Sequence, residues 1–240
     1  MGHGSSAEAA QVRDSGLRHA ALVRVTHWIT AAAFLALLAS GAEIVISHPR
    51  FYWGETGNVN TAPLFRLPIP SSRPTVPTGY GYVLPDQNGW SRYLHFESAW
   101  VAVLTGLVYA GFGLARGHFR RNLVPARTDL TRTALAAGDA WRYNALQRLT
   151  YLLVIFVLFP LVIWTGLAMS PGFTAAVPWA VTLLGGRQSA RTIHFFVSIA
   201  LTVFLAVHVA MVWRAGFRRR VGAMITGRAG MEGEHEHFAA

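Results

Sequence analysis

The sequence contains no cysteine, no lysine and few charged residues of any kind. The absence of cysteine excludes disulfide bonds, iron–sulfur clusters held by thiolates and c-type haem attached through a Cys-x-x-Cys-His motif. Charged residues make up 13% of the 240 positions, whereas about a quarter is usual in a soluble domain, and 52% of the residues are hydrophobic. This balance excludes an ordinary soluble domain and predicts one integral membrane domain.

The net charge of +10 comes from 21 arginines set against 11 acidic residues. In a soluble protein this excess would indicate nucleic-acid binding. Here the arginines lie mainly beside apolar segments, a pattern typical of residues that orient a protein in membrane lipid. We therefore expect contact with lipid and no nucleic-acid partner.

Four apolar segments are each long enough to cross a bilayer, which takes about 20 helical residues. They lie at about 22–46, 91–114, 146–169 and 191–213. Pro160 falls inside the third segment, where a membrane helix tolerates proline with a kink. The sequence thus predicts an all-α, four-transmembrane-helix bundle at 22–220, between an N-terminal tail at 1–21 and a C-terminal tail at 221–240.

The connection at 48–90 holds seven of the eleven prolines. This density of proline excludes a regular helix, so we expect a long loop outside the membrane. A loop of this length is usually functional, and it offers enough area for a docking surface. A shorter loop is expected at 170–190.

Arginine counts predict the orientation of the four spans. If the N-terminus lies in the cytoplasm, 15 of the 21 arginines lie on the cytoplasmic side of the membrane and six lie outside. Because cytoplasmic segments carry an excess of arginine, both termini are expected in the cytoplasm and the proline-rich loop on the outer side.

Four histidines lie inside the apolar segments, at two depths. His194 and His208 are fourteen residues apart in the fourth segment, and a helix separates such residues by roughly 21 Å along its axis and about 40° around it. With alternating spans, His27 near the inner end of the first segment shares the depth of His208. His95 near the outer start of the second segment shares the depth of His194.

Two histidines that face each other across a bundle are what b-type haem requires, since each imidazole takes one axial position of the iron. With both axial positions filled by the protein, the chemistry that remains is one-electron transfer, and two such haems would form a path for electrons across the membrane. Alternatively, each histidine is structural and hydrogen-bonded to a neighbouring helix. The other six histidines lie in tails or loops and are expected in solvent (His3, His19, His48, His118, His235 and His237).

Three arginines each precede a candidate ligand by three residues, about one helical turn (Arg24, Arg92 and Arg191). The planar guanidinium group suits carboxylates, so these residues are candidate partners of haem propionates. They are equally typical of a membrane boundary. Four glycines within the spans would let a porphyrin approach the backbone or would serve helix packing (Gly41, Gly106, Gly111 and Gly166).

Several motifs carry a resemblance to a known family. They are Val-Arg-Val-Thr-His-Trp at 23–28, Arg-Tyr-Leu-His-Phe at 92–96, Arg-Leu-Thr-Tyr at 148–151 with Thr-Gly-Leu-Ala-Met at 165–169, and the pair His194 and His208. Over about residues 20–220 the sequence resembles the bacterial di-haem cytochrome b-561 and nickel-iron hydrogenase b-type cytochrome superfamily, which includes the gamma subunits of formate dehydrogenases and the cytochrome b subunits of thiosulfate reductases.

The resemblance implies two b-type haems, an inner one bound by His27 and His208 and an outer one bound by His95 and His194. It implies an electron-transfer subunit of the bacterial inner membrane, not the substrate-converting subunit, which connects a periplasmic oxidoreductase with quinone. The expected partner is a molybdenum enzyme, with a hydrogenase second. The alternatives are a free-standing cytochrome b that oxidises quinol and a non-redox membrane anchor or proton relay. The long proline-rich loop favours the docked subunit.

Overall fold

The computed structural model describes residues 20–58, 60–69, 87–117, 119 and 145–227. Four of its helical stretches are long and apolar enough to cross a membrane, which confirms the predicted four-helix architecture. They are α2 (Ala21–Ser47), α3 (Gln87–Ala115), the continuous run of α6 (Ala145–Leu153), η2 (Val154–Leu158) and α7 (Phe159–Ala168), and α10 (Arg187–Arg214). Most of both tails, residues 70–86 of the proline-rich loop, most of the arginine-rich segment after α3 and five of the six histidines expected in solvent lie outside the described residues.

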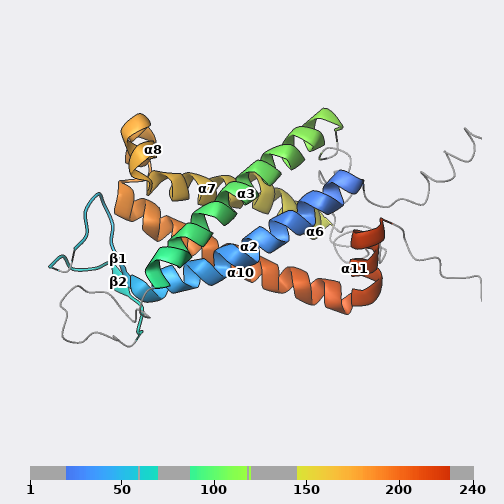
Figure 1. The fold of residues 1–240 in the computed structure, drawn as a ribbon, viewed down its shortest axis with the longest axis horizontal. Coiled ribbons are helices and arrows are strands. Elements are labelled where there is room, and N and C mark those ends of the chain that lie inside the picture. Colours follow the sequence, from blue (N-terminus) through green and yellow to red (C-terminus); the bar gives the residue numbers. More distant parts are fainter. Residues whose placement is uncertain (1–19, 59, 70–86, 118, 120–144, 228–240) are drawn as a thin grey trace, which may run out of the picture.

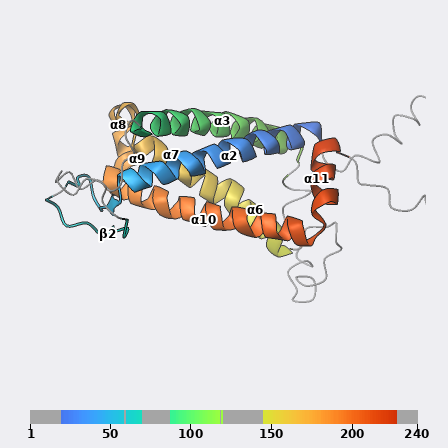
Figure 2. The same ribbon diagram turned by 60° about the horizontal axis from the view of Figure 1, so that its bottom comes forward.

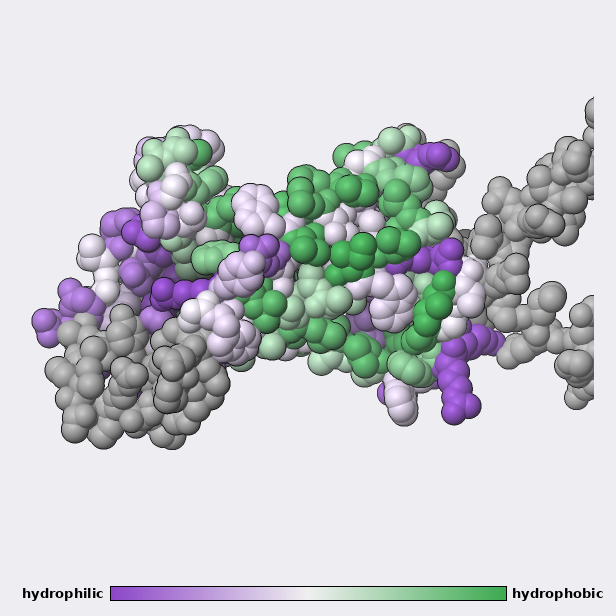
Figure 3. Space-filling model, viewed as in Figure 1, coloured by the Kyte–Doolittle hydropathy of each residue, from purple (hydrophilic) through white to green (hydrophobic). Residues whose placement is uncertain are grey.

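The four spans are arranged as two helix pairs. α2 packs along α3, and α10 packs along α7, whereas close backbone approaches between the two pairs are few. Both ribbon views show α2 beside α3 over much of its length (Figures 1 and 2). Hydrophobic side chains gather over the middle of the visible face and hydrophilic ones toward its two ends (Figure 3). The described part of the molecule therefore presents a lipid-compatible belt of hydrophobic side chains between two hydrophilic ends.

The third span accommodates Pro160 by means of a widened helical turn just before it. Proline has no N–H group to complete the α-helical ladder, and its ring collides with the carbonyl four residues earlier. The chain responds with the π-helix η2, in which the Phe159 N–H bonds to the Val154 carbonyl, five residues back. α7 then continues with Pro160 in its first turn. The span thus stays helical across the proline.

One end of the bundle carries a two-stranded hairpin, and we name it the hairpin end. β1 (Arg50–Phe51) pairs antiparallel with β2 (Phe65–Arg66). Phe51 is 2% exposed because its ring lies between those of Phe65 and Phe195. The loop after β1 is fixed to the start of α10, since the Thr192 hydroxyl donates to the Tyr52 carbonyl over 2.7 Å.

The predicted loop at 170–190 is more helical than expected. It contains α8 (Pro171–Ala176) and α9 (Pro178–Thr182), and α10 already begins at Arg187. Each of the two short helices starts with a proline, whose fixed φ suits the first position of a helix and whose missing N–H is not needed there. The prolines that indicated a loop therefore mark helix starts. α8 lies at the hairpin end, opposite α11 (Figure 1).

The opposite end carries α11 (Phe217–Thr226), and we name it the α11 end. Gly216 and Gly227 flank this helix with φ of 91° and 82°, a conformation that favours glycine. α11 crosses the end of the bundle (Figure 2) and is fastened to the start of α2. The Arg24 Nη1 donates to the Ile225 carbonyl over 2.6 Å, and the Trp28 Nε1 donates to the Met224 carbonyl over 3.3 Å. The C-terminal tail expected from residue 221 thus begins inside a docked helix.

Candidate functional site

The four histidines of the spans meet as two pairs. At the hairpin end, the rings of His95 and His194 have centroids 6.2 Å apart. At the α11 end, the rings of His27 and His208 have centroids 6.3 Å apart. In each pair one histidine comes from the α2 and α3 pair of helices and the other comes from α10. The histidines therefore sit where the two helix pairs face each other.

Hydroxyl and carbonyl groups surround the hairpin-end pair. The Nδ1 of His95 lies 3.1 Å from the Ser40 hydroxyl oxygen. The Nδ1 of His194 lies 3.1 Å from the Thr165 hydroxyl oxygen and 3.0 Å from the Val162 carbonyl. These contacts orient both rings through the nitrogen next to the side-chain stem, and they leave the far nitrogen, Nε2, for another partner.

Aromatic rings surround the α11-end pair. The His208 ring stacks on Phe204, with centroids 5.8 Å apart and planes 25° apart. The Trp28 ring meets His27 edge-on at 5.4 Å. The Tyr151 hydroxyl lies 3.4 Å from the His208 Nδ1, a weaker contact than those at the hairpin end. This pair is oriented mainly by packing.

An apolar layer separates the two pairs. Val154, Val197 and Leu201 are buried there, and Phe34 and Phe204 pack against them. Phe34 of α2 and Phe159 of α7 meet edge-on with centroids 6.5 Å apart, which is a contact between the two helix pairs. The two sites are thus distinct, stacked along the bundle and insulated from each other by hydrocarbon.

The residues present fit a haem iron held between two imidazoles. Two imidazoles bound to opposite sides of one metal ion, through bonds of about 2 Å each, have ring centroids roughly 6 Å apart, which is the spacing of both pairs. Ring nitrogens that ligate metal usually have the other nitrogen hydrogen-bonded, as both hairpin-end histidines do. No group of three or more His, Cys, Asp or Glu residues suited to a bare metal ion occurs within the described part of the chain.

Two glycines keep space beside the hairpin-end pair. A Cβ placed on Gly41 would lie 3.5 Å from the His95 Cε1, and one on Gly166 would lie 3.4 Å from the His194 Cε1. Gly106 and Gly111, by contrast, have nothing within 4 Å of such an atom. Of the four glycines singled out in the sequence, Gly41 and Gly166 therefore adjoin the histidines and the other two do not.

The three candidate propionate arginines lie at the two ends of the bundle, and two of them also bond to backbone. Arg24 is bonded to the last turn of α11. The Arg191 Nη2 donates to the His48 carbonyl, and its guanidinium lies over the Phe51 ring at 5.1 Å. Arg92 is exposed. Arg24 and Arg191 thus fasten chain segments to the bundle, a role that the sequence did not reveal.

His48, expected in solvent, is half-buried at the hairpin end. Its Nδ1 lies 3.3 Å from the Ile44 carbonyl, just beyond the end of α2. Burial, followed by the positive charges of Arg191 and Arg92, lowers the pKa of His48 from 6.5 to about 4. His48 is therefore neutral at physiological pH beside two cations. In the sequence, the position of His48 directly after the first span was the one feature that could have indicated partial burial.

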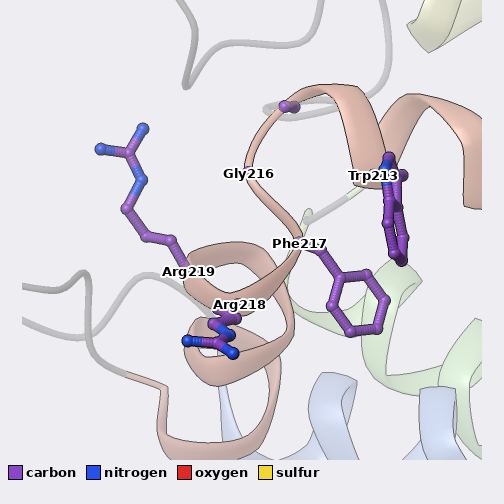
Figure 4. A pocket seen from close by; sticks show the side chains of 6 residues that line it. Trp213, Gly216, Phe217, Arg218 and Arg219 are labelled. Atoms are coloured by element: carbon purple, nitrogen blue, oxygen red, sulfur yellow. The ribbon is translucent and has the colours of Figure 1, made fainter.

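Aromatic and basic side chains gather where α10 meets α11. An open pocket there is lined by Trp213, Gly216, Phe217, Arg218 and Arg219, among others (Figure 4). The Trp213 and Phe217 rings lie 5.4 Å apart and are 69% and 43% exposed. Aromatic rings beside arginine are typical of the level where a membrane meets water. The α11 end thus has the composition of a membrane boundary.

The comparisons with known proteins agree with this architecture. Residues 18–227 match the family described as prokaryotic cytochrome b561. The chain is also 31% identical over 222 residues to the putative protein-methionine-sulfoxide reductase subunit YedZ1 of Azospira oryzae, a similarity that covers 87% of this chain and 96% of the relative. No solved structure matches the chain. The family implies b-type haem and electron transport. The chain is a multi-pass membrane protein with four spans and belongs to the prokaryotic cytochrome b561 family.

Proposed function

We propose that the chain is a di-haem membrane subunit that transfers electrons between quinone and a periplasmic oxidoreductase. The observation that carries the proposal is the presence of two histidine pairs with the same ring spacing, 6.2 Å and 6.3 Å, at opposite ends of one apolar bundle. His95 and His194 would hold one b-type haem, and His27 and His208 the other. A single pair would fit many structural roles, but two matched pairs fit a transmembrane electron path.

The haems would supply reversible one-electron oxidation and reduction, and the chain supplies their placement. Each pair would offer two imidazoles to one haem, so the protein would supply both of the iron's own ligands and leave no place there for substrate. α10 carries one histidine of each pair and so fixes the spacing of the two sites along the bundle. The hydrocarbon layer around Phe34 and Leu201 keeps water out of the space between the sites. The protein thereby favours electron transfer over bond-making chemistry.

The hairpin end is the expected docking side for the partner. Under the orientation that the arginine counts favour, this end faces the periplasm and both termini face the cytoplasm of a bacterial inner membrane. Phe195 and Phe196 follow His194 directly, and their rings lie near Phe51 and Phe65 of the hairpin. Phe196 is 53% exposed, so an aromatic surface adjoins the candidate haem site. A partner seated there would approach the haem closely.

The relative from Azospira oryzae, whose name describes a subunit of a protein-methionine-sulfoxide reductase, supports a sulfoxide-reducing partner. Oxidation of one quinol releases two electrons and two protons, and reduction of one sulfoxide to a thioether and water consumes two of each. The chain would pass these electrons one at a time from the α11 end to the hairpin end. The similarity to this relative therefore favours a sulfoxide reductase over a hydrogenase as the partner.

The experiment is a visible difference spectrum of the detergent-purified full chain, dithionite-reduced minus oxidised, with pyridine haemochrome quantitation. Two b-type haems per chain are expected. None in a chain expressed with ample haem supply would overturn the electron-transfer function and leave a membrane anchor or proton relay. If two haems are present, rapid haem reduction by a short-chain quinol is expected. Absence of that reduction would remove quinone from the proposal.

A further inference from the structure

We propose that the hydroxyl groups of Ser40 and Thr165 are positioning groups that fix the tautomer of the hairpin-end histidines and lower the reduction potential of the haem bound there. The inference rests on the proposed function, since it concerns a haem held by His95 and His194. Ser40 and Thr165 lie on α2 and α7, which supply neither histidine at this end, and they would act on the reduction potential through the two rings.

The two hydroxyls are placed in the same way on different helices. Both residues are fully buried. The Ser40 hydroxyl donates to the Ala36 carbonyl over 2.7 Å, and the Thr165 hydroxyl donates to the Leu161 carbonyl, also over 2.7 Å. Each hydroxyl hydrogen is therefore engaged with the residue four positions earlier. The oxygen lone pairs remain as acceptors pointing across the helix pair.

These lone pairs meet the ring nitrogens of the neighbouring helix. The Ser40 oxygen lies 3.1 Å from the His95 Nδ1, and the Thr165 oxygen lies 3.1 Å from the His194 Nδ1. The Val162 carbonyl, which can only accept, lies 3.0 Å from the same nitrogen of His194. Nδ1 must therefore carry the hydrogen in both rings, and Nε2 keeps the lone pair that a metal requires.

A glycine follows each hydroxyl residue. Gly41 and Gly166 leave the space against the Cε1 atoms of the same two rings, at 3.5 Å and 3.4 Å from a virtual Cβ. The two-residue arrangement of hydroxyl and glycine thus occurs once in α2 and once in α7. Two independent copies of one geometry, each aimed at one histidine of the same pair, are hard to attribute to helix packing alone.

The α11-end pair lacks this arrangement. There the single hydroxyl contact to a ring is that of Tyr151 with His208, at 3.4 Å, and His27 has no such contact within the described residues. Among the described residues, the pairing of a hydroxyl and a glycine beside a histidine ring therefore occurs at the hairpin-end site and not at the α11-end site. A hydrogen bond accepted from a ligating imidazole raises its basicity and favours the more positive, ferric iron. The hairpin-end haem should consequently be harder to reduce than the same haem without the two hydroxyls.

The experiment is an equilibrium redox titration of the purified full chain, followed at the reduced haem band. Thr165→Val and Ser40→Ala each remove a hydroxyl at nearly constant shape, and Thr165→Ser restores one. At a fixed ambient potential near the midpoint, loss of either hydroxyl should lower the ferric-to-ferrous ratio of the hairpin-end haem about three- to tenfold. A tenfold change corresponds to a rise of about 59 mV in the reduction potential. The hairpin-end haem is identified as the one lost in His95→Ala.

Thr202→Val is the matched control. Thr202 lies in α10, is exposed, and donates its hydroxyl to the Ser198 carbonyl four residues earlier, but it contacts neither histidine pair. Its substitution should leave both potentials unchanged, as should Thr165→Ser. The low-spin ferric electron paramagnetic resonance signal of the hairpin-end haem should shift in Thr165→Val and Ser40→Ala and stay constant in both controls.

The outcomes separate the inference from the proposed function. Unchanged potential and resonance signal in both hydroxyl-free variants would overturn the inference and leave the di-haem function intact. If Thr165→Val binds no hairpin-end haem, restoration by Thr165→Ser supports the hydroxyl role, and failure to restore contradicts it. Absence of haem from the unsubstituted chain would overturn the proposed function itself.

Discussion

At the hairpin end, one backbone carbonyl and two side-chain hydroxyls contact the histidine rings, and two glycines leave room beside them. At the α11 end, the rings pack against Trp28, Phe204 and Tyr151. The spacing within the two pairs is nevertheless the same to 0.1 Å. The difference shows that helix positions set the distance between the paired rings, whereas the immediate surroundings are free to vary. Under the proposed function, two chemically identical haems would thereby receive different potentials in one bundle.

The largest expected effect divides the four histidines into two groups of two. His95→Ala and His194→Ala should each remove the hairpin-end haem, and His27→Ala and His208→Ala the α11-end haem, so that haem content falls from two to one per chain. A single remaining imidazole would hold the haem only weakly. Haemochrome quantitation and spectra of the four variants check this grouping. His48→Ala, a histidine outside both pairs, should retain two haems. Loss of different haems within one pair would contradict the pairing.

The second prediction tests the space beside one pair only. Gly166→Leu should displace the His194 ring and reduce occupancy of the hairpin-end haem at least several-fold, because the side chain extends well beyond a Cβ already in van der Waals contact with that ring. Gly166→Ala should be tolerated. Gly106→Leu, at an exposed glycine with nothing within 4 Å, is the control and should bind both haems fully. Equal haem loss in Gly166→Leu and Gly106→Leu would show that the effect is general destabilisation.

The third prediction concerns the α11 end. Arg24→Gln should weaken docking of α11 by about 1 kcal/mol, since it removes a charge-assisted hydrogen bond to a helix C-terminus. Hydrogen exchange of the amides in 217–226 should then accelerate about fivefold. Exchange around the hairpin should not change. Arg214→Gln, which alters an arginine in the last turn of α10, serves as the control. Unchanged exchange in α11 would show that the Arg24 contact does not secure the helix.

The smallest effect is a pH dependence confined to the hairpin end. The pKa of His48 is about 4 in the folded chain and 6.5 ordinarily, so the unfolded chain binds the proton more readily between these values. The contribution of neutral His48 to stability is complete above about pH 6.5 and is lost as the pH falls toward 4. Thermal unfolding in detergent from pH 4 to 8 should show a shallower acid decline for His48→Gln. An identical pH profile for the two chains would exclude His48 as a contributor.

The spans could be predicted from sequence because hydropathy and length are local properties. The equal depths of His27 with His208 and of His95 with His194 followed from counting residues along straight helices. The contacts of Ser40 and Thr165 could not be predicted, because they depend on how each helix is rotated about its axis. The Arg24 contact joins residues 201 positions apart, and no local pattern encodes it. α11 is an amphipathic stretch between Gly216 and Gly227, and its second half lies in the segment that the sequence predicts as a tail.

Both histidine pairs take one member from α10, the last of the four spans. During synthesis, therefore, neither pair exists until the final span has entered the membrane. The arrival of α10 then completes both histidine pairs at once. A chain that ended before residue 194 would keep His27 and His95 without their partners, so under the proposed function it would complete neither haem site.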